Sequence, residues 1–157
     1  GVPFYLRTGK RLAARDAQIV VNFRPVPHPI FPGAHRANQL VIKLQPEDGL
    51  ELRLLAAKGS GVGEALAPVS LDLDFDRAFP SERVGAYERL LLDAIAGRLN
   101  LFVRSDEQEQ AWRWVEPILH AWESDPSDLK TYTAGSWGPP ASSAMVARDG
   151  FAWAEEQ

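Results

Sequence analysis

The sequence has no cysteine among its 157 residues. It can therefore form no disulfide framework, no thiolate zinc site and no cysteine nucleophile. It also has no apolar run of the roughly 20 residues that cross a bilayer, so we expect no contact with a membrane interior. A surplus of positive charge is missing too, because 17 Lys and Arg stand against 21 Asp and Glu, a net charge of −4. This balance gives no general reason to bind nucleic acid or an anionic membrane surface.

What is present fits one folded domain over residues 1–157. The 45% hydrophobic and 24% charged content excludes a disordered tail. A chain of this length should bury about 70% of its unfolded surface, so we expect a core that needs no stabilising cross-links. The chain starts at Gly1 without an initiator Met and enters strand-like sequence directly. We therefore expect a fragment of a longer protein.

The first half of the chain predicts strands. Short β-branched or aromatic runs and period-two alternation each indicate one, and alternation with one polar face favours an antiparallel sheet. The expected strands are 4–7, 18–23, 39–44, 50–54 and 71–76.

The second half predicts helices. Apolar residues recur at helical spacing over 87–95, with Gly97 as the stop, and again over 111–122. Ser105 with Gln108 predicts a capping box before the second helix. A shorter helix should follow Pro140 and end near Gly150. Strands first and helices later predict an α+β fold, a large mostly antiparallel sheet with helices packed on one face.

Arg7 to Arg15 is the segment richest in chemistry. It holds four cations and no acid within nine residues, and Gly9 allows a tight turn or a close backbone approach. Fixed cations beside free N–H groups can bind an anion, although a solvated basic turn remains the plainer alternative. The segment is no P-loop, because Phe4 and Arg11 stand where that motif needs Gly and Ser or Thr.

Other candidate motifs fail on spacing. Asp72 to Asp76 starts like a calcium loop, but Arg77 occupies the glycine position. The glycines of 59–63 lack the dinucleotide-binding spacing, so a hairpin connection is expected there. The three histidines form no ligand set, and we expect no metal site. Two further expectations are a long proline-bearing loop over 24–38 and core packing for the tryptophans of the second helix.

Five segments in order resemble glucose-6-phosphate dehydrogenase. The resemblance covers nearly the whole chain and corresponds to the later part of that family's C-terminal domain. The matching segments are residues 1–10, 38–46, 86–93, 102–107 and 135–139.

The resemblance implies an NADP-dependent enzyme that oxidises glucose 6-phosphate to 6-phosphoglucono-lactone in the pentose phosphate pathway. The family's nucleotide-binding loop and its His base precede this region, so the resemblance implies no catalytic residue here. NADP would be bound mainly by the absent N-terminal domain, and this chain alone should be inactive. The family further implies a cytoplasmic protein that forms a homo-oligomer, a dimer or tetramer, through the sheet.

The resemblance also names substrate-binding residues. Lys10 matches a lysine that binds the sugar phosphate, in the family's Arg-x-Gly-Lys motif. Arg15 stands where several members have a second substrate-binding lysine, and Gln45 matches a substrate-contacting glutamine. Some members bind a second, structural NADP, but Asp16, Val20 and Glu51 replace its ligands here, so we expect none. The alternative is a catalytically silent sugar-phosphate-binding or dimerisation module.

Overall fold

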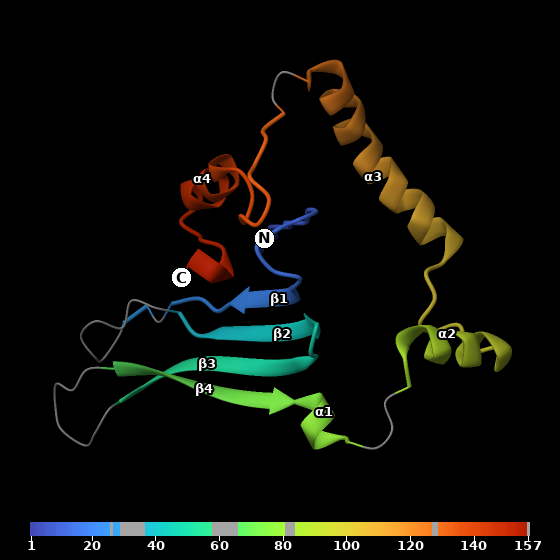
Figure 1. The fold of residues 1–157 in the computed structure, drawn as a ribbon, viewed down its shortest axis with the longest axis horizontal. Helices are drawn as coiled ribbons and strands as arrows, with labels where there is room; N and C mark the ends of the chain where they lie inside the picture. The colour runs from blue at the N-terminus through green and yellow to red at the C-terminus, as the bar shows by residue number, and fades with distance from the viewer. Residues whose placement is uncertain (26, 29–36, 58–65, 81–83, 127–128, 157) are drawn as a thin grey trace.

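The computed structural model describes residues 1–25, 27–28, 37–57, 66–80, 84–126 and 129–156. The expected hairpin connection at 59–63 and most of the proline-bearing loop lie outside these residues. Four strands form one antiparallel sheet in the order β1-β2-β3-β4 (Figure 1). The strands are β1 (Ala17–Asn22), β2 (Gln39–Gln45), β3 (Gly49–Ala57) and β4 (Leu66–Asp74).

The helices come after the sheet in sequence, which confirms the α+β prediction. They are α1 (Phe75–Ala78), α2 (Ala86–Ile95), α3 (Ser105–Ser124), α4 (Pro140–Arg148) and the short 3₁₀ helix η2 (Ala154–Glu156). α1 packs against the end of β4, whereas Figure 1 shows α2 and α3 lying away from the sheet.

Three local predictions were wrong. Residues 4–7 form no strand, because their side chains bond to the C-terminal part of the chain instead. The last predicted strand stops at Asp74, whose carboxylate accepts a hydrogen bond from the Arg77 backbone N–H and caps α1. Arg104, not Ser105, is the N-cap of α3, and the Glu107 carboxylate accepts the Arg104 backbone N–H at 3.0 Å.

Helix α2 ends as the sequence predicts, with Gly97 at φ 69° just beyond it. The sequence did not indicate that this end also holds a buried acid. Asp93 accepts hydrogen bonds from Arg89 at 3.3 Å and from Arg98 at 2.8 Å. These charge-assisted bonds compensate the carboxylate for the water that it loses on burial.

The expectation of a self-sufficient core was wrong. Val41 and Val146 are the fully buried apolar side chains, and the accessible surface is 13378 Å². A compact domain of this mass would expose about 7,900 Å². The described part of the chain therefore leaves much of its apolar surface uncovered.

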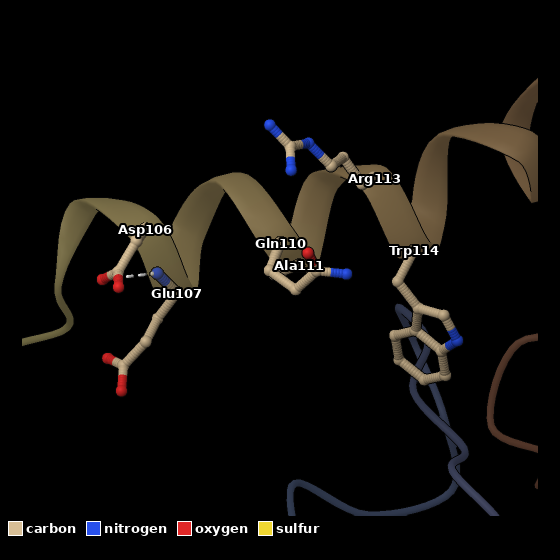
Figure 2. Close-up of a pocket in the computed structure, with 6 residues that line it drawn as sticks. All are labelled: Asp106, Glu107, Gln110, Ala111, Arg113 and Trp114. Atoms are coloured by element: carbon tan, nitrogen blue, oxygen red, sulfur yellow. Dashed lines mark hydrogen bonds between the residues drawn. The ribbon is translucent and has the colours of Figure 1, made fainter.

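Helix α3 shows this most clearly. Its three tryptophans were expected in a core, but each is more than half exposed, and Trp114 is 75% exposed. A hollow of about 720 Å³ runs along one side of α3, and every described residue that lines it belongs to this helix (Figure 2). This surface has one wall only, so we do not interpret it as an enclosed binding site.

The register divides the sheet into an apolar and a polar face, because residues directly opposite in an antiparallel pair share a face. On the apolar face, Ile19, Ile42, Leu50 and Leu73 form one row across the four strands. The adjacent row consists of Val21, Leu40, Leu52 and Leu71.

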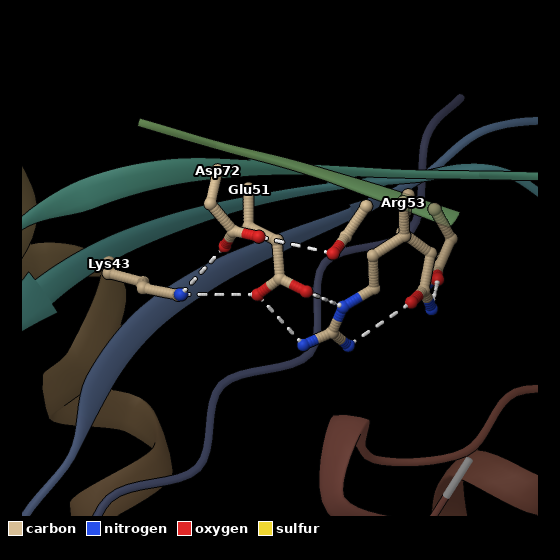
Figure 3. Close-up of polar contacts among 7 residues, drawn as sticks. Lys43, Glu51, Arg53 and Asp72 are labelled. Carbon is tan, nitrogen blue, oxygen red and sulfur yellow. Dashed lines mark hydrogen bonds and ion pairs between the residues drawn. The ribbon is translucent and has the colours of Figure 1, made fainter. Parts of the chain in front are cut away.

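The polar face has an ion-pair network across β2, β3 and β4 (Figure 3). Arg53 Nε donates to Glu51 at 2.6 Å, and Lys43 Nζ lies 3.2 Å from Glu51 and 3.4 Å from Asp72. The Arg53 guanidinium, with a smaller effect of Lys43, holds the pKa of Glu51 below its ordinary value although burial opposes this. Glu51 in turn raises the pKa of Lys43.

This network predicts acid sensitivity. A carboxyl whose pKa is lowered by folding stabilises the fold above its unfolded pKa, and this stabilisation is lost as pH falls through the folded pKa. Glu51→Gln should therefore lower the free energy of unfolding at pH 7 by about 1 kcal/mol. The difference from the unmutated protein should shrink below about pH 4. Urea unfolding of both full-length proteins at several pH values measures this difference in unfolding free energy.

Asp106→Asn is the matched control, because Asp106 pairs with Arg104 on an exposed surface. We expect almost no change in unfolding free energy for it at any pH. A Glu51→Gln deficit that is as large at pH 3 as at pH 7 would contradict the assignment.

Candidate functional site

The basic segment before β1 divides its cations between two roles. The Arg7 guanidinium lies 4.4 Å from the ring centroid of Trp153 and 5.1 Å from that of Trp137, and it pairs with Glu155. Arg7 therefore stacks between aromatic rings with its charge already matched. It drops out of the expected four-cation anion site.

Lys10 and Arg11 form a turn whose backbone is held by residues far away in the sequence. The Tyr132 hydroxyl donates to the Lys10 carbonyl at 2.7 Å, and the Gly135 N–H donates to the Arg11 carbonyl at 2.8 Å. Arg11 has φ 55°, in the left-handed region that side chains rarely adopt. A strained residue persists where its surroundings over-determine it, and such residues cluster at functional sites.

The side chain of Lys10 remains exposed. Among the described residues, the side chains of Lys10, Arg15 and Gln45 make no hydrogen bond or ion pair with one another or with any other group. Each is therefore free to bind a ligand.

The sheet register brings two of the three expected substrate-binding residues near each other. Gln45, at the end of β2, lies opposite Ala17, and Arg15 is two residues before Ala17. Arg15 and Gln45 therefore lie at the same end of the β1–β2 pair. Lys10 is five residues upstream of Arg15, in the turn that Tyr132 and Gly135 hold.

The residues expected to exclude a structural NADP are placed on or near the polar face of the sheet. Val20 and Glu51 occupy one row, because both lie opposite Val41. Asp16 immediately precedes β1. The absence of structural NADP stays a prediction.

A second hollow, of about 230 Å³, lies at the β2–β3 turn. Its lining includes Glu47, Asp48, Asp72 and Asp74, against the two cations Lys43 and Arg77. This excess of carboxylates disfavours a phosphate. The described residues include no cluster of His, Cys, Asp or Glu that could hold a metal ion.

Sequence reasoning missed Tyr132 and Gly135 as residues that act on the Lys10 turn. They lie more than 120 residues further along the chain, and no spacing rule joins them to Lys10. The only sequence signal was the adjacent Gly135 to Pro139 match, which marked the segment without indicating its contact.

The chain was compared with known proteins. The family model described as the C-terminal domain of glucose-6-phosphate dehydrogenase matches residues 1–154. A glucose-6-phosphate 1-dehydrogenase of Rhizobium meliloti is 49% identical over 156 residues, which is 98% of this chain and 32% of the relative. One from Mycolicibacterium smegmatis is 48% identical, with 98% and 31% covered.

Solved structures agree with these relatives. A glucose-6-phosphate dehydrogenase in complex with its substrate glucose-6-phosphate superposes with a TM-score of 0.79 at 28% identity, over 93% of this chain and 30% of that one. The enzyme of Mycobacterium avium gives a TM-score of 0.69 at 34% identity, over 92% and 29%.

The chain thus spans about a third of the length of the relatives it matches. Within the described residues, no helix is both long and apolar enough to span a membrane. The match over residues 1–154 shows that the chain belongs to the family of the glucose-6-phosphate dehydrogenase C-terminal domain.

Proposed function

We propose that residues 1–157 are the later part of the C-terminal domain of a glucose-6-phosphate dehydrogenase. The full protein would oxidise glucose 6-phosphate at C1 and pass the hydride to NADP, in the cytoplasm and within the pentose phosphate pathway. The observation that carries this proposal is the alignment of 98% of the chain with glucose-6-phosphate 1-dehydrogenases at 49% and 48% identity.

Lys10 is the residue that would bind the sugar phosphate. Its exposed ammonium has no partner among the described residues, so it can place a positive charge beside a dianion without breaking an ion pair. Arg15 and Gln45, together at one end of β1 and β2, would contact the same substrate. A guanidinium can bind phosphate oxygens, and an amide can accept from or donate to sugar hydroxyls.

Replacing the lysine tests this site. Lys10→Ala in the full-length enzyme should raise the KM for glucose 6-phosphate at least tenfold, because a charge-assisted hydrogen bond contributes about 1.5–3 kcal/mol. The KM for NADP should stay unchanged. Steady-state kinetics measures both constants.

Arg113→Ala is the control for loss of one positive charge, because Arg113 is exposed on α3. Its KM for glucose 6-phosphate should match that of the unmutated enzyme. An unaltered KM in Lys10→Ala would remove Lys10 from the substrate site.

The nucleotide and the catalytic base belong to the preceding N-terminal domain in this proposal. Residues 1–157 contain no spaced glycine fingerprint for NADP. The chain alone should therefore show no glucose 6-phosphate-dependent formation of NADPH. An absorbance assay, with the full-length enzyme as positive control, measures this. Turnover by the isolated chain would refute the division of roles.

We assign the apolar face of the sheet to the remainder of the same domain. Leu71 on this face is 63% exposed, and Ile19 is 50% exposed. A sheet with a continuous apolar face needs a second layer of secondary structure over it. About two thirds of each matched relative lies outside the part that aligns with this chain and could supply this layer.

The polar face remains for a second copy of the protein. Its charged residues Lys43 and Asp72 are about half exposed and carry opposite signs. Exposed charges of opposite sign suit an interface that is exposed to solvent before the copies assemble. A homo-oligomer, either a dimer or a tetramer, would form through this face.

The assignment of the apolar face predicts a stability effect. Leu71→Asp in the full-length enzyme should lower the thermal midpoint by about 5 °C or more, because it places an unpaired charge under the covering layer. Arg113→Asp is the control, since Arg113 is exposed on α3 and belongs to neither face of the sheet. Equal midpoints for the two variants would show that the apolar face has no cover.

A further inference from the structure

The N-terminal segment has no regular structure of its own. Residues 1–16 form no helix or strand, so no ladder of backbone hydrogen bonds fixes their course. Among the described residues, their hydrogen bonds and ion pairs come instead from the last quarter of the chain. Figure 1 shows the coil between α3 and α4 passing beside this segment.

Four hydrogen bonds or ion pairs join the two segments, besides the ring contacts of Tyr5 with Phe151 and of Arg7 with Trp137 and Trp153. The Tyr5 hydroxyl donates to Asp149, which raises the pKa of Tyr5, and Arg7 pairs with Glu155. The other two are the hydrogen bonds to the Lys10 and Arg11 carbonyls. Only this second pair acts on the turn that carries Lys10.

Those two hydrogen bonds fix the orientation of consecutive peptide groups. Tyr132 holds the carbonyl of Lys10 from its hydroxyl, and Gly135 holds the carbonyl of Arg11 from its backbone N–H. Between them Arg11 adopts φ 55°. With both carbonyls fixed, the direction in which the Lys10 side chain leaves the backbone is fixed as well.

Gly9 makes room for this arrangement. A Cβ at position 9 would lie 2.9 Å from the Tyr132 hydroxyl oxygen and 3.4 Å from the Leu12 side chain. Real Cβ atoms essentially never come as close as the first distance. A side chain at position 9 would therefore displace the tyrosine hydroxyl, and the glycine leaves that space open.

We infer that Tyr132 is a positioning residue for Lys10: its hydroxyl, seated against Gly9, holds the lysine turn in the orientation that presents the ammonium to the substrate phosphate. This inference rests on the proposed function of Lys10. A loosened turn would weaken capture of glucose 6-phosphate without touching the reacting atoms.

Tyr132→Phe in the full-length enzyme tests the role of the hydroxyl. The variant loses only the hydroxyl oxygen and keeps the aromatic ring. Most of the Tyr132 surface is covered, with 38% exposed, so the ring keeps its packing contacts. The KM for glucose 6-phosphate should rise about 3- to 10-fold, as for loss of one neutral hydrogen bond. The kcat should change by less than about twofold. The KM for NADP should stay constant.

Tyr5→Phe is the matched control, since it removes the hydroxyl that ties the same two segments together at Asp149, away from the lysine turn. We expect no change in KM for it. A KM rise of equal size in both variants would overturn the inference, because it would reduce Tyr132 to one general tie among several. An unchanged KM in Tyr132→Phe would overturn it directly.

A double-mutant cycle separates positioning from simple loss of stability. Gly9→Ala should raise the KM because its methyl group displaces the Tyr132 hydroxyl. Gly9→Ala combined with Tyr132→Phe should have the KM of the worse single variant, because the hydroxyl can be lost only once. Multiplication of the two single effects would contradict the proposed seat of Tyr132 on Gly9.

Lys10→Ala distinguishes a failure of the proposed substrate site from a failure of the positioning role of Tyr132. If it leaves the KM unchanged, the proposed substrate site fails, and with it the inference that rests on it. If it raises the KM while Tyr132→Phe does not, the positioning role alone fails and the lysine site stands.

Discussion

The register of the four-stranded sheet is the constraint on which the other features of this structure depend. Side chains alternate across a strand, so a slip of one residue would exchange the two faces. In the observed register, Leu50 and Leu52 of β3 lie opposite Leu73 and Leu71 of β4, and Glu51 lies opposite Asp72 on the other side. The same register places Gln45 beside the start of β1 and therefore near Arg15.

The two cations of the Arg-x-Gly-Lys segment have different environments. Arg7 has a planar guanidinium that stacks on aromatic rings. It lies between Trp137 and Trp153 and pairs with Glu155. Lys10 has a compact ammonium on a flexible stem, which stays free for a ligand. Arg7 thus holds the segment, and Lys10 is the residue to which we assign its binding chemistry.

The sequence predicted the parts of the fold that depend on local periodicity. The strands after residue 16 follow from β-branched runs and alternation, and the three longer helices follow from apolar spacing and from Pro140 and Gly150 as start and stop. Residues 4–7 were mistaken for a strand because an apolar run does not reveal whether a partner strand lies beside it. Their actual partners, such as Asp149 for Tyr5, are 144 residues away. The Tyr132 contact with Lys10 escaped prediction for the same reason.

Periodicity also identified the apolar side of α3 without identifying what covers it. A tryptophan side chain can bury 150–250 Å², so the exposed rings at Trp112, Trp114 and Trp122 are a large apolar surface on one helix. Exposed apolar patches of several hundred Å² mark contact sites in soluble proteins. We propose the same explanation for the open helix face as for the open sheet face, namely that the remainder of the longer domain covers both. Among the described residues, Val41 and Val146 are the apolar side chains that reach full burial.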